Sequence, residues 1–138
     1  MTLAAGDLAK LQECDSRLVV VFSEVAKYYD LAVLEGYRSQ ARQLQLYREG
    51  KSRVQFGKHN MVPSQAVDIA LKPIDWGESG DRTTREKALK RFYFLAGFVF
   101  GLANSMQIKL RWGGDWDSDL DFTDQTFDDL CHFEVLNV

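Results

Sequence analysis

Apolar residues recur at helical spacing in two stretches of the chain. The first stretch places four apolar residues on one face of a helix: Leu18, Val21, Phe22 and Val25. Asp15 or Ser16 can cap this helix, which we expect to run to about Tyr29. A second helix is expected from Ser39 to Gly50, because glycine suits the left-handed position that follows a helix.

The longest apolar stripe predicts a third helix from Thr84 to about Met106. Thr83 and Glu86 fit the capping box that begins many helices. The stripe repeats every three or four residues: Leu89, Phe92, Leu95, Val99, Leu102 and Met106. Such a stripe is typical of packing against a core. Its apolar run from Phe92 to Ala103 is shorter than the about 20 residues that span a bilayer, so we expect a buried helix and no membrane partner.

Short apolar or alternating segments predict strands between and after these helices. We expect strands at Leu31–Glu35, Ala66–Leu71, Ile108–Trp112 and Cys131–Leu136, with loops over residues 51–65 and an acidic loop over 115–129. Strands and helices mix without a regular βαβ alternation. The pattern therefore favours an α+β fold, with a small antiparallel sheet packed against helices.

Composition adds that the chain is one soluble domain. It has 138 residues, of which 46% are hydrophobic and 27% charged, so it can bury a core, and we expect a single domain over residues 1–138 and a monomer. Cys14 and Cys131 lie far apart and do not form a disulfide framework, which favours synthesis in a reducing compartment. The first residues lack a basic segment followed by an apolar one, so no signal peptide is expected.

Charge is distributed unevenly along the chain. Eight acidic residues and no Lys or Arg follow Arg111, and the basic part before it has no cluster of cations with interleaved aromatics, so no nucleic-acid partner is expected. Four aspartates alternate in the segment Asp115–Asp121: Asp115, Asp117, Asp119 and Asp121. This spacing could supply oxygen ligands to Ca²⁺, although it lacks the Gly and Glu of an EF-hand loop. A solvated acidic loop is the alternative.

The chain has only two histidines, and each lies near carboxylates. His59 is followed by Asp68, and His132 is preceded by Asp129. Two imidazoles and one carboxylate are the ligand count of a catalytic zinc site with one open position. We therefore hypothesise that His59, Asp68 and His132 hold zinc, with Asp129 close enough to exchange protons with water. Glu134, on the same strand face as His132, is a second candidate for proton transfer or for orienting a ligand. Ordinary hydrogen-bonding roles are the alternative for each residue.

These segments together resemble a known family. His59 with Ala66-Val67-Asp68, and Asp129-Leu130-Cys131-His132-Phe133-Glu134, are similar to zinc peptidases of the D-alanyl-D-alanine carboxypeptidase type. That group also includes phage L-alanyl-D-glutamate endopeptidases and the VanY and VanX enzymes. Further similarity lies in Glu35–Ser39, in Leu46-Tyr47 with Gly50–Ser52, and in Trp112–Trp116, so the resemblance runs from about Leu31 to the C-terminus.

The resemblance implies a role for each candidate. It makes His59, Asp68 and His132 the zinc ligands in a cleft and Asp129 the general acid/base. Arg38 matches an arginine that stabilises the developing oxyanion, a structural ion pair being the alternative. From aromatic chemistry alone, Trp112 and Trp116 could form a wall of the substrate cleft, with core packing the alternative for Trp112.

The chain also departs from the family pattern. Gly57 stands where a serine is usual and Ser64 where a glycine is usual, and the interval from His59 to Asp68 is longer than usual. These departures leave the ligand types intact but alter the loop between them.

The resemblance implies a phage endolysin that cleaves the L-alanyl-D-glutamate bond of the peptidoglycan stem peptide. It would be made in the host cytoplasm and act at the wall, in the periplasm, after release by another protein. A D-alanyl-D-alanine carboxypeptidase is the alternative activity. A zinc-containing module that binds without cleaving is the alternative from a different class.

Overall fold

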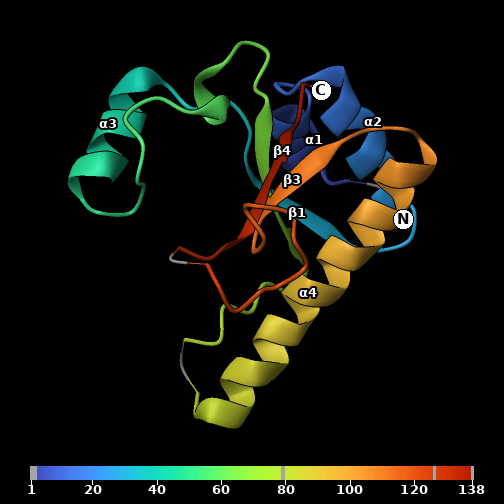
Figure 1. The fold of residues 1–138 in the computed structure, drawn as a ribbon. Coiled ribbons are helices and arrows are strands. Elements are labelled where there is room, and N and C mark those ends of the chain that lie inside the picture. The colour runs from blue at the N-terminus through green and yellow to red at the C-terminus, as the bar shows by residue number, and fades with distance from the viewer. Residues whose placement is uncertain (1–2, 79, 126, 138) are drawn as a thin grey trace.

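The computed structural model describes residues 3–78, 80–125 and 127–137. These residues form an antiparallel sheet packed against helices, so the expected α+β class is confirmed (Figure 1). The four strands lie in the order β1-β2-β4-β3. They are β1 (Leu31–Glu35), β2 (Ala66–Leu71), β3 (Leu110–Gly113) and β4 (Asp129–Val135). The two central strands, β2 and β4, come from distant parts of the chain.

In the described part of the chain, three helices pack against this sheet and a fourth, α3 (Gln40–Arg48), stands apart from it. The other three are α1 (Ala5–Leu11), α2 (Ser16–Val25) and α4 (Arg82–Ser105), with a single 3₁₀ turn, η1 (Lys58–Asn60). In Figure 1, α3 stands apart from α4, with the sheet between them. None of the helices in the described residues is both long and apolar enough to cross a membrane.

The ends of α2 and α3 follow the sequence signals closely, with one difference. The Asp15 carboxylate accepts a hydrogen bond from the Arg17 amide, and the Ser39 hydroxyl caps α3 in the same way. Gly50 adopts the predicted left-handed conformation, with φ of 75°. However, α2 ends at Val25 rather than near Tyr29, because residues 26–29 form tight turns that lead the chain into β1.

The expected start of the long helix is wrong by two residues. The cap is Asp81, whose carboxylate accepts from the Thr84 amide at 2.9 Å, and not Thr83. Glu86 instead pairs with Arg82 on the surface. Of the predicted apolar stripe of α4, Phe92, Leu95 and Val99 are buried, and Leu102 and Met106 are partly buried against the core, whereas Leu89 is outside that core.

Three further differences concern elements with weak local signals. Helix α1 was not predicted, and its N-cap residue, Ala4, offers no side-chain acceptor. Strand β3 begins at Leu110 rather than Ile108. Strand β4 begins at Asp129, which we had assigned to a loop.

Alternation along β2 and β4 separates the core from the functional residues. Val67 and Ile69 of β2, and Phe133 and Val135 of β4, belong to the buried apolar cluster. Phe133 meets Phe22 of α2 edge to face, with ring centroids 5.3 Å apart. Because successive side chains of a strand point to opposite faces, the intervening residues face away from α2. Those residues are Asp68, His132 and Glu134.

Candidate metal centre

Pairing of β2 with β4 brings together the three residues predicted as ligands. Asp68 lies directly opposite His132 in the register of the two strands, and η1 carries His59 beside them. His59 Nε2 lies 3.2 Å and His132 Nδ1 3.3 Å from the same oxygen, Oδ1, of Asp68. The three residues are buried and offer donor atoms within 4.8 Å of one another. This is a candidate metal site of two nitrogens and one carboxylate.

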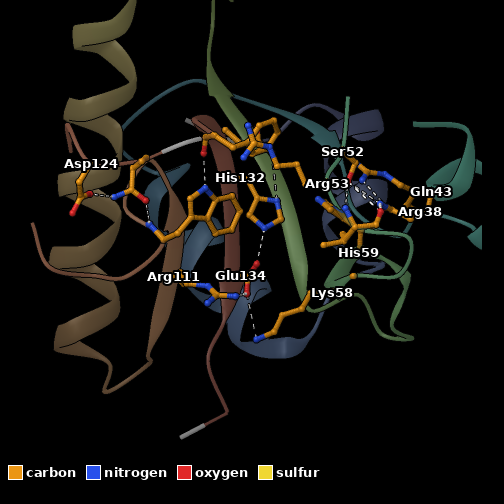
Figure 2. Close-up of a pocket in the computed structure, with 16 residues that line it drawn as sticks. Arg38, Gln43, Ser52, Arg53, Lys58, His59, Arg111, Asp124, His132 and Glu134 are labelled. Atoms are coloured by element: carbon orange, nitrogen blue, oxygen red, sulfur yellow. Dashed lines mark hydrogen bonds and ion pairs between the residues drawn. The ribbon is translucent and has the colours of Figure 1, made fainter. Parts of the chain in front are cut away.

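The outward-facing nitrogen of each histidine is also held. His59 Nδ1 lies 2.7 Å from the carbonyl oxygen of Gly36. A carbonyl only accepts, so Nδ1 carries a proton and Nε2 is the nitrogen that faces Asp68. His132 Nε2 lies 2.9 Å from Oε1 of Glu134 (Figure 2). Its Nδ1 is the nitrogen that faces Asp68. Histidines that bind metals commonly donate their second N–H to a carbonyl or carboxylate in this way. The donor set therefore fits a metal ion.

Glu134 is held in turn by two cations. Arg111, opposite it on β3, donates from Nη2 to Oε2 at 2.8 Å, and Lys58 Nζ lies 3.5 Å from the same oxygen. Burial raises the pKa of Glu134, but His132 and Arg111 outweigh burial and lower the pKa to about 2. A permanently charged Glu134 keeps the Nε2 proton of His132 in place. This favours the ligand-orienting alternative for Glu134 over proton transfer.

The charges of His132, Asp68 and Glu134 stabilise one another. Burial lowers the pKa of His132, but hydrogen bonds to Asp68 and Glu134 outweigh it and raise the pKa to about 9. Burial likewise raises the pKa of Asp68, yet the two histidines hold that pKa well below its usual range. The positive charge of protonated His132 thus balances the Asp68 carboxylate, as a bound metal cation would.

Asp129 reaches the centre through an irregularity in the sheet. Strict alternation would place Asp129 and His132 on opposite faces of β4. The register shifts between Trp112 and Gly113, so that Gly113 pairs with Asp129. Asp129 Oδ2 then lies 3.9 Å from His132 Nδ1. Gly113 permits this approach, because a Cβ there would lie 2.0 Å from the Asp129 carbonyl oxygen.

The environment of Asp129 suits a group that exchanges protons. Burial and the negative charge of Asp68 raise the pKa of Asp129. A carboxyl whose pKa is raised takes and returns a proton more readily near neutral pH. The thiol of Cys131 donates to Oδ1 of Asp129 at 3.4 Å.

Arg38 lies beside the ligands in a network of acceptors. Its Nε and Nη2 donate to the two oxygens of Glu35 at 2.9 and 2.7 Å. Nη2 also lies 3.6 Å from Oδ2 of Asp68. Nη1 donates to the side-chain oxygen of Gln43 at 2.9 Å. Arg38 therefore forms the ion pair that was its alternative reading and also presents its guanidinium to the metal centre.

Gln43 is a residue that the sequence analysis missed. It is a fully buried polar residue on α3, a helix whose only other buried residue is Leu46. The available signal was its spacing of three residues from Leu46, which places the two side chains on the same face of the helix.

The centre opens into a cleft of about 510 Å³. Both histidines, Arg38 and Asp129 line it, together with Trp116 and the loop residues on either side (Figure 2). Trp116 is half-buried, its indole N–H donates to the Phe127 carbonyl at 2.6 Å, and its ring lies 5.3 Å from that of His132. Trp112 instead belongs to the core and is only 2% exposed. The structure thus separates the two tryptophans that aromatic chemistry had grouped.

Carboxylates of the acidic segment Asp115–Asp121 accept hydrogen bonds from backbone amides of the same loop. Carboxylate oxygens of Asp115, Asp117 and Asp119 lie within 4.8 Å of one another, but the last two residues are exposed. Asp115 Oδ2 accepts the Leu120 amide, and Asp119 Oδ1 accepts that of Asp121. These oxygens serve the turns of the loop itself, and Asp121 is outside the group. The proximity of acidic groups is common without an ion, so calcium gains no support.

The two departures from the family pattern have different surroundings. Ser64 is fully buried, and its hydroxyl donates to the Ala66 carbonyl at 2.7 Å, so it stabilises the long loop before β2. Gly57 lines the cleft, and its amide donates to the Asn60 side chain.

The described cysteines, Cys14 and Cys131, are both free, as the sequence indicated.

Comparisons with known proteins agree with this geometry. A family model described as phage L-alanyl-D-glutamate peptidase matches residues 1–136. Among solved structures, the L-Ala D-Glu endopeptidase ChiX of Serratia marcescens is similar in fold, with a TM-score of 0.72 and 24% sequence identity. The alignment covers 99% of this chain and 90% of that protein.

Proposed function

Because the chain belongs to the phage L-alanyl-D-glutamate peptidase family, we propose that it is a zinc endopeptidase cleaving the L-alanyl-D-glutamate bond of the peptidoglycan stem peptide. That it is a peptidoglycan peptidase follows from the family; the bond, the metal and the residue roles are the proposal. One observation carries it: His59, Asp68 and His132 offer donor atoms within 4.8 Å of one another, and both histidines line a cleft together with Asp129.

The proposed zinc ligands are His59 Nε2, His132 Nδ1 and the carboxylate of Asp68. Two imidazoles and one carboxylate are a ligand set that catalytic zinc uses. When bound, zinc would polarise the scissile carbonyl and lower the pKa of a water molecule to about 7. Glu134 and the Gly36 carbonyl hold the imidazoles in the tautomers that this binding requires.

Asp129 supplies the proton transfers. Its carboxylate accepts a proton from the attacking water as the C–O bond forms, and then delivers that proton to the leaving amine as the C–N bond breaks. The net result is a free carboxyl group on alanine and a free amino group on glutamate. Its raised pKa serves both directions of transfer.

Arg38 stabilises the charge that develops on the carbonyl oxygen during attack. Its guanidinium is fixed by Glu35 and Gln43 before substrate arrives, so little reorganisation is needed when the charge appears. Trp116, whose ring lies 5.3 Å from that of His132, offers an aromatic wall for the stem peptide.

The site of action is the bacterial cell wall, as the family implies. We propose that a monomer acts there, from the periplasm, after synthesis in the host cytoplasm. Calcium binding at Asp115–Asp121 stays a prediction and has no part in this proposal.

Mass spectrometry of purified peptidoglycan digested by the protein tests the proposal. We expect muropeptides that end at L-alanine and peptides that begin with an unblocked D-glutamate. Release of D-alanine alone would identify a carboxypeptidase. Binding to the wall without release of amino groups would identify a non-catalytic module.

A further inference from the structure

Gln43 of α3 joins the metal centre to the wall of the cleft. Its side chain is 1% exposed, although it is polar, and it lines the cleft. A buried amide without partners is costly, so the contacts of such a residue indicate what it holds in place.

The hydrogen bonds of Gln43 fix its orientation. The side-chain oxygen accepts from Arg38 Nη1 at 2.9 Å. The side-chain nitrogen donates to the Ser52 hydroxyl at 2.9 Å and to the Val54 carbonyl at 2.7 Å. A guanidinium only donates and a carbonyl only accepts, so a flipped amide would lose both contacts. Figure 2 shows Gln43 between Arg38 and Ser52.

Arg38 needs a second anchor beyond its ion pair. Glu35 binds Nε and Nη2, which form one edge of the guanidinium. That pair alone allows Arg38 and Glu35 to swing together, because the Glu35 side chain is 28% exposed. Gln43 binds the remaining nitrogen, Nη1, from a rigid helix. The guanidinium is thereby fixed on two sides, with Nη2 directed toward Asp68.

We propose that Gln43 is a positioning residue that holds the Arg38 guanidinium in register with the cleft wall at residues 52–54. A stem peptide that contacts this wall would then meet Arg38 at a fixed position relative to the scissile carbonyl. The inference rests on the role proposed above for Arg38.

Gln43→Met tests the proposal because it keeps the length of the side chain and removes its hydrogen bonds. We expect kcat to fall roughly ten- to hundredfold, as for reacting groups displaced by up to about 1 Å, with zinc content retained. Gln45→Met is the matched control, because Gln45 is exposed on the same helix and its side chain donates to Glu49 of that helix end. Unchanged kcat in folded Gln43→Met would overturn the proposal.

Gln43→Glu is a second variant that keeps an oxygen for Arg38 but loses both donors to the wall. We expect it to retain most of kcat and to raise KM, because Arg38 stays anchored while residues 52–54 are released. A loss of kcat as large as that of Gln43→Met, in a folded protein, would contradict the positioning role. This variant also keeps the test decisive if Gln43→Met does not fold.

A double-mutant cycle shows whether Gln43 acts through Arg38. In an Arg38→Met background, Gln43→Met should change kcat by less than about twofold, because coupled residues are not additive. An equal loss in both backgrounds would overturn the inference alone. Absence of L-alanyl-D-glutamate cleavage by the wild-type protein in the same assay would instead overturn the proposed function.

Discussion

Gly113 decides where Asp129 lies, and replacing it by alanine is therefore a sharp test of the acid/base assignment. The glycine pairs with Asp129 across β3 and β4 at the point where the register shifts. An added Cβ would lie 2.0 Å from the Asp129 carbonyl oxygen and 2.9 Å from its Cβ. These are backbone atoms of Asp129 and its Cβ, whose position the backbone fixes, so no side-chain rotation relieves the contact.

The size of the effect follows from this overlap. Cβ atoms essentially never approach closer than 3.0 Å to another heavy atom, so the strands must separate locally by about 1 Å. A displacement of about 1 Å at a reacting group costs roughly a hundredfold in rate. This corresponds to about 2.7 kcal/mol of transition-state stabilisation. The proposed zinc ligands are His59 of η1, Asp68 of β2 and His132 of β4. None of them pairs with Gly113, so metal content should stay near that of the wild type.

The assay is steady-state hydrolysis of purified stem peptide, with zinc content and thermal unfolding measured on the same samples. Gly101→Ala is the matched control, since a Cβ at Gly101 in α4 meets nothing within 4 Å. Alanine in a helix interior is favoured over glycine by roughly 0.5–1 kcal/mol, so this variant should be fully active and slightly more stable. Wild-type turnover in Gly113→Ala would refute the positioning of Asp129 described above.

Other predictions concern the carboxylates and their titration. Asp129→Asn should retain its zinc and its fold but lose about a hundredfold or more in kcat. Asp128→Asn, which changes an exposed neighbouring residue, should stay active. Equal activities of the two variants would exclude Asp129 as the acid/base. Glu134→Ala should weaken zinc binding about ten- to hundredfold in chelator competition, and unchanged affinity would show that His132 needs no partner. Burial lowers the pKa of His132, but Asp68 and Glu134 outweigh it and raise the pKa to about 9. In protein treated with a metal chelator, protonated His132 should therefore contribute its full stability below the ordinary histidine pKa of about 6.5. That stability should be lost as pH rises through 9, and thermal unfolding with chelator that shows no such loss would contradict the pairing.

Local signals predicted most of the helices and strands. Asp15, Ser39 and Gly50 act at helix ends as expected, because each works through its own backbone neighbours. The start of α4 was misplaced since Asp81 and Thr83 are both competent caps, and the sequence does not show which amide is within reach. Helix α1 was not predicted, because its N-cap residue Ala4 has no capping side chain and the helix is only 7 residues long.

The candidate site was predictable in its residue types but not in its supports. His59, Asp68 and His132 could be chosen from ligand chemistry, and their convergence depends on the pairing of β2 with β4, which spacing does not reveal. The shift at Gly113 that turns Asp129 toward His132 is also a property of strand pairing. Gln43 was missed for the same reason, since its partners lie on other segments of the chain.

Zinc titration of the metal-stripped protein tests the central claim most directly. The rate at which new amino-terminal D-glutamate appears in digested peptidoglycan would be measured as zinc is added. Both histidines of the chain belong to the group with Asp68, so the rate should rise from near zero and level off at one equivalent of zinc per chain. A stripped protein that releases D-glutamate at the full rate without zinc would contradict the proposed metal centre.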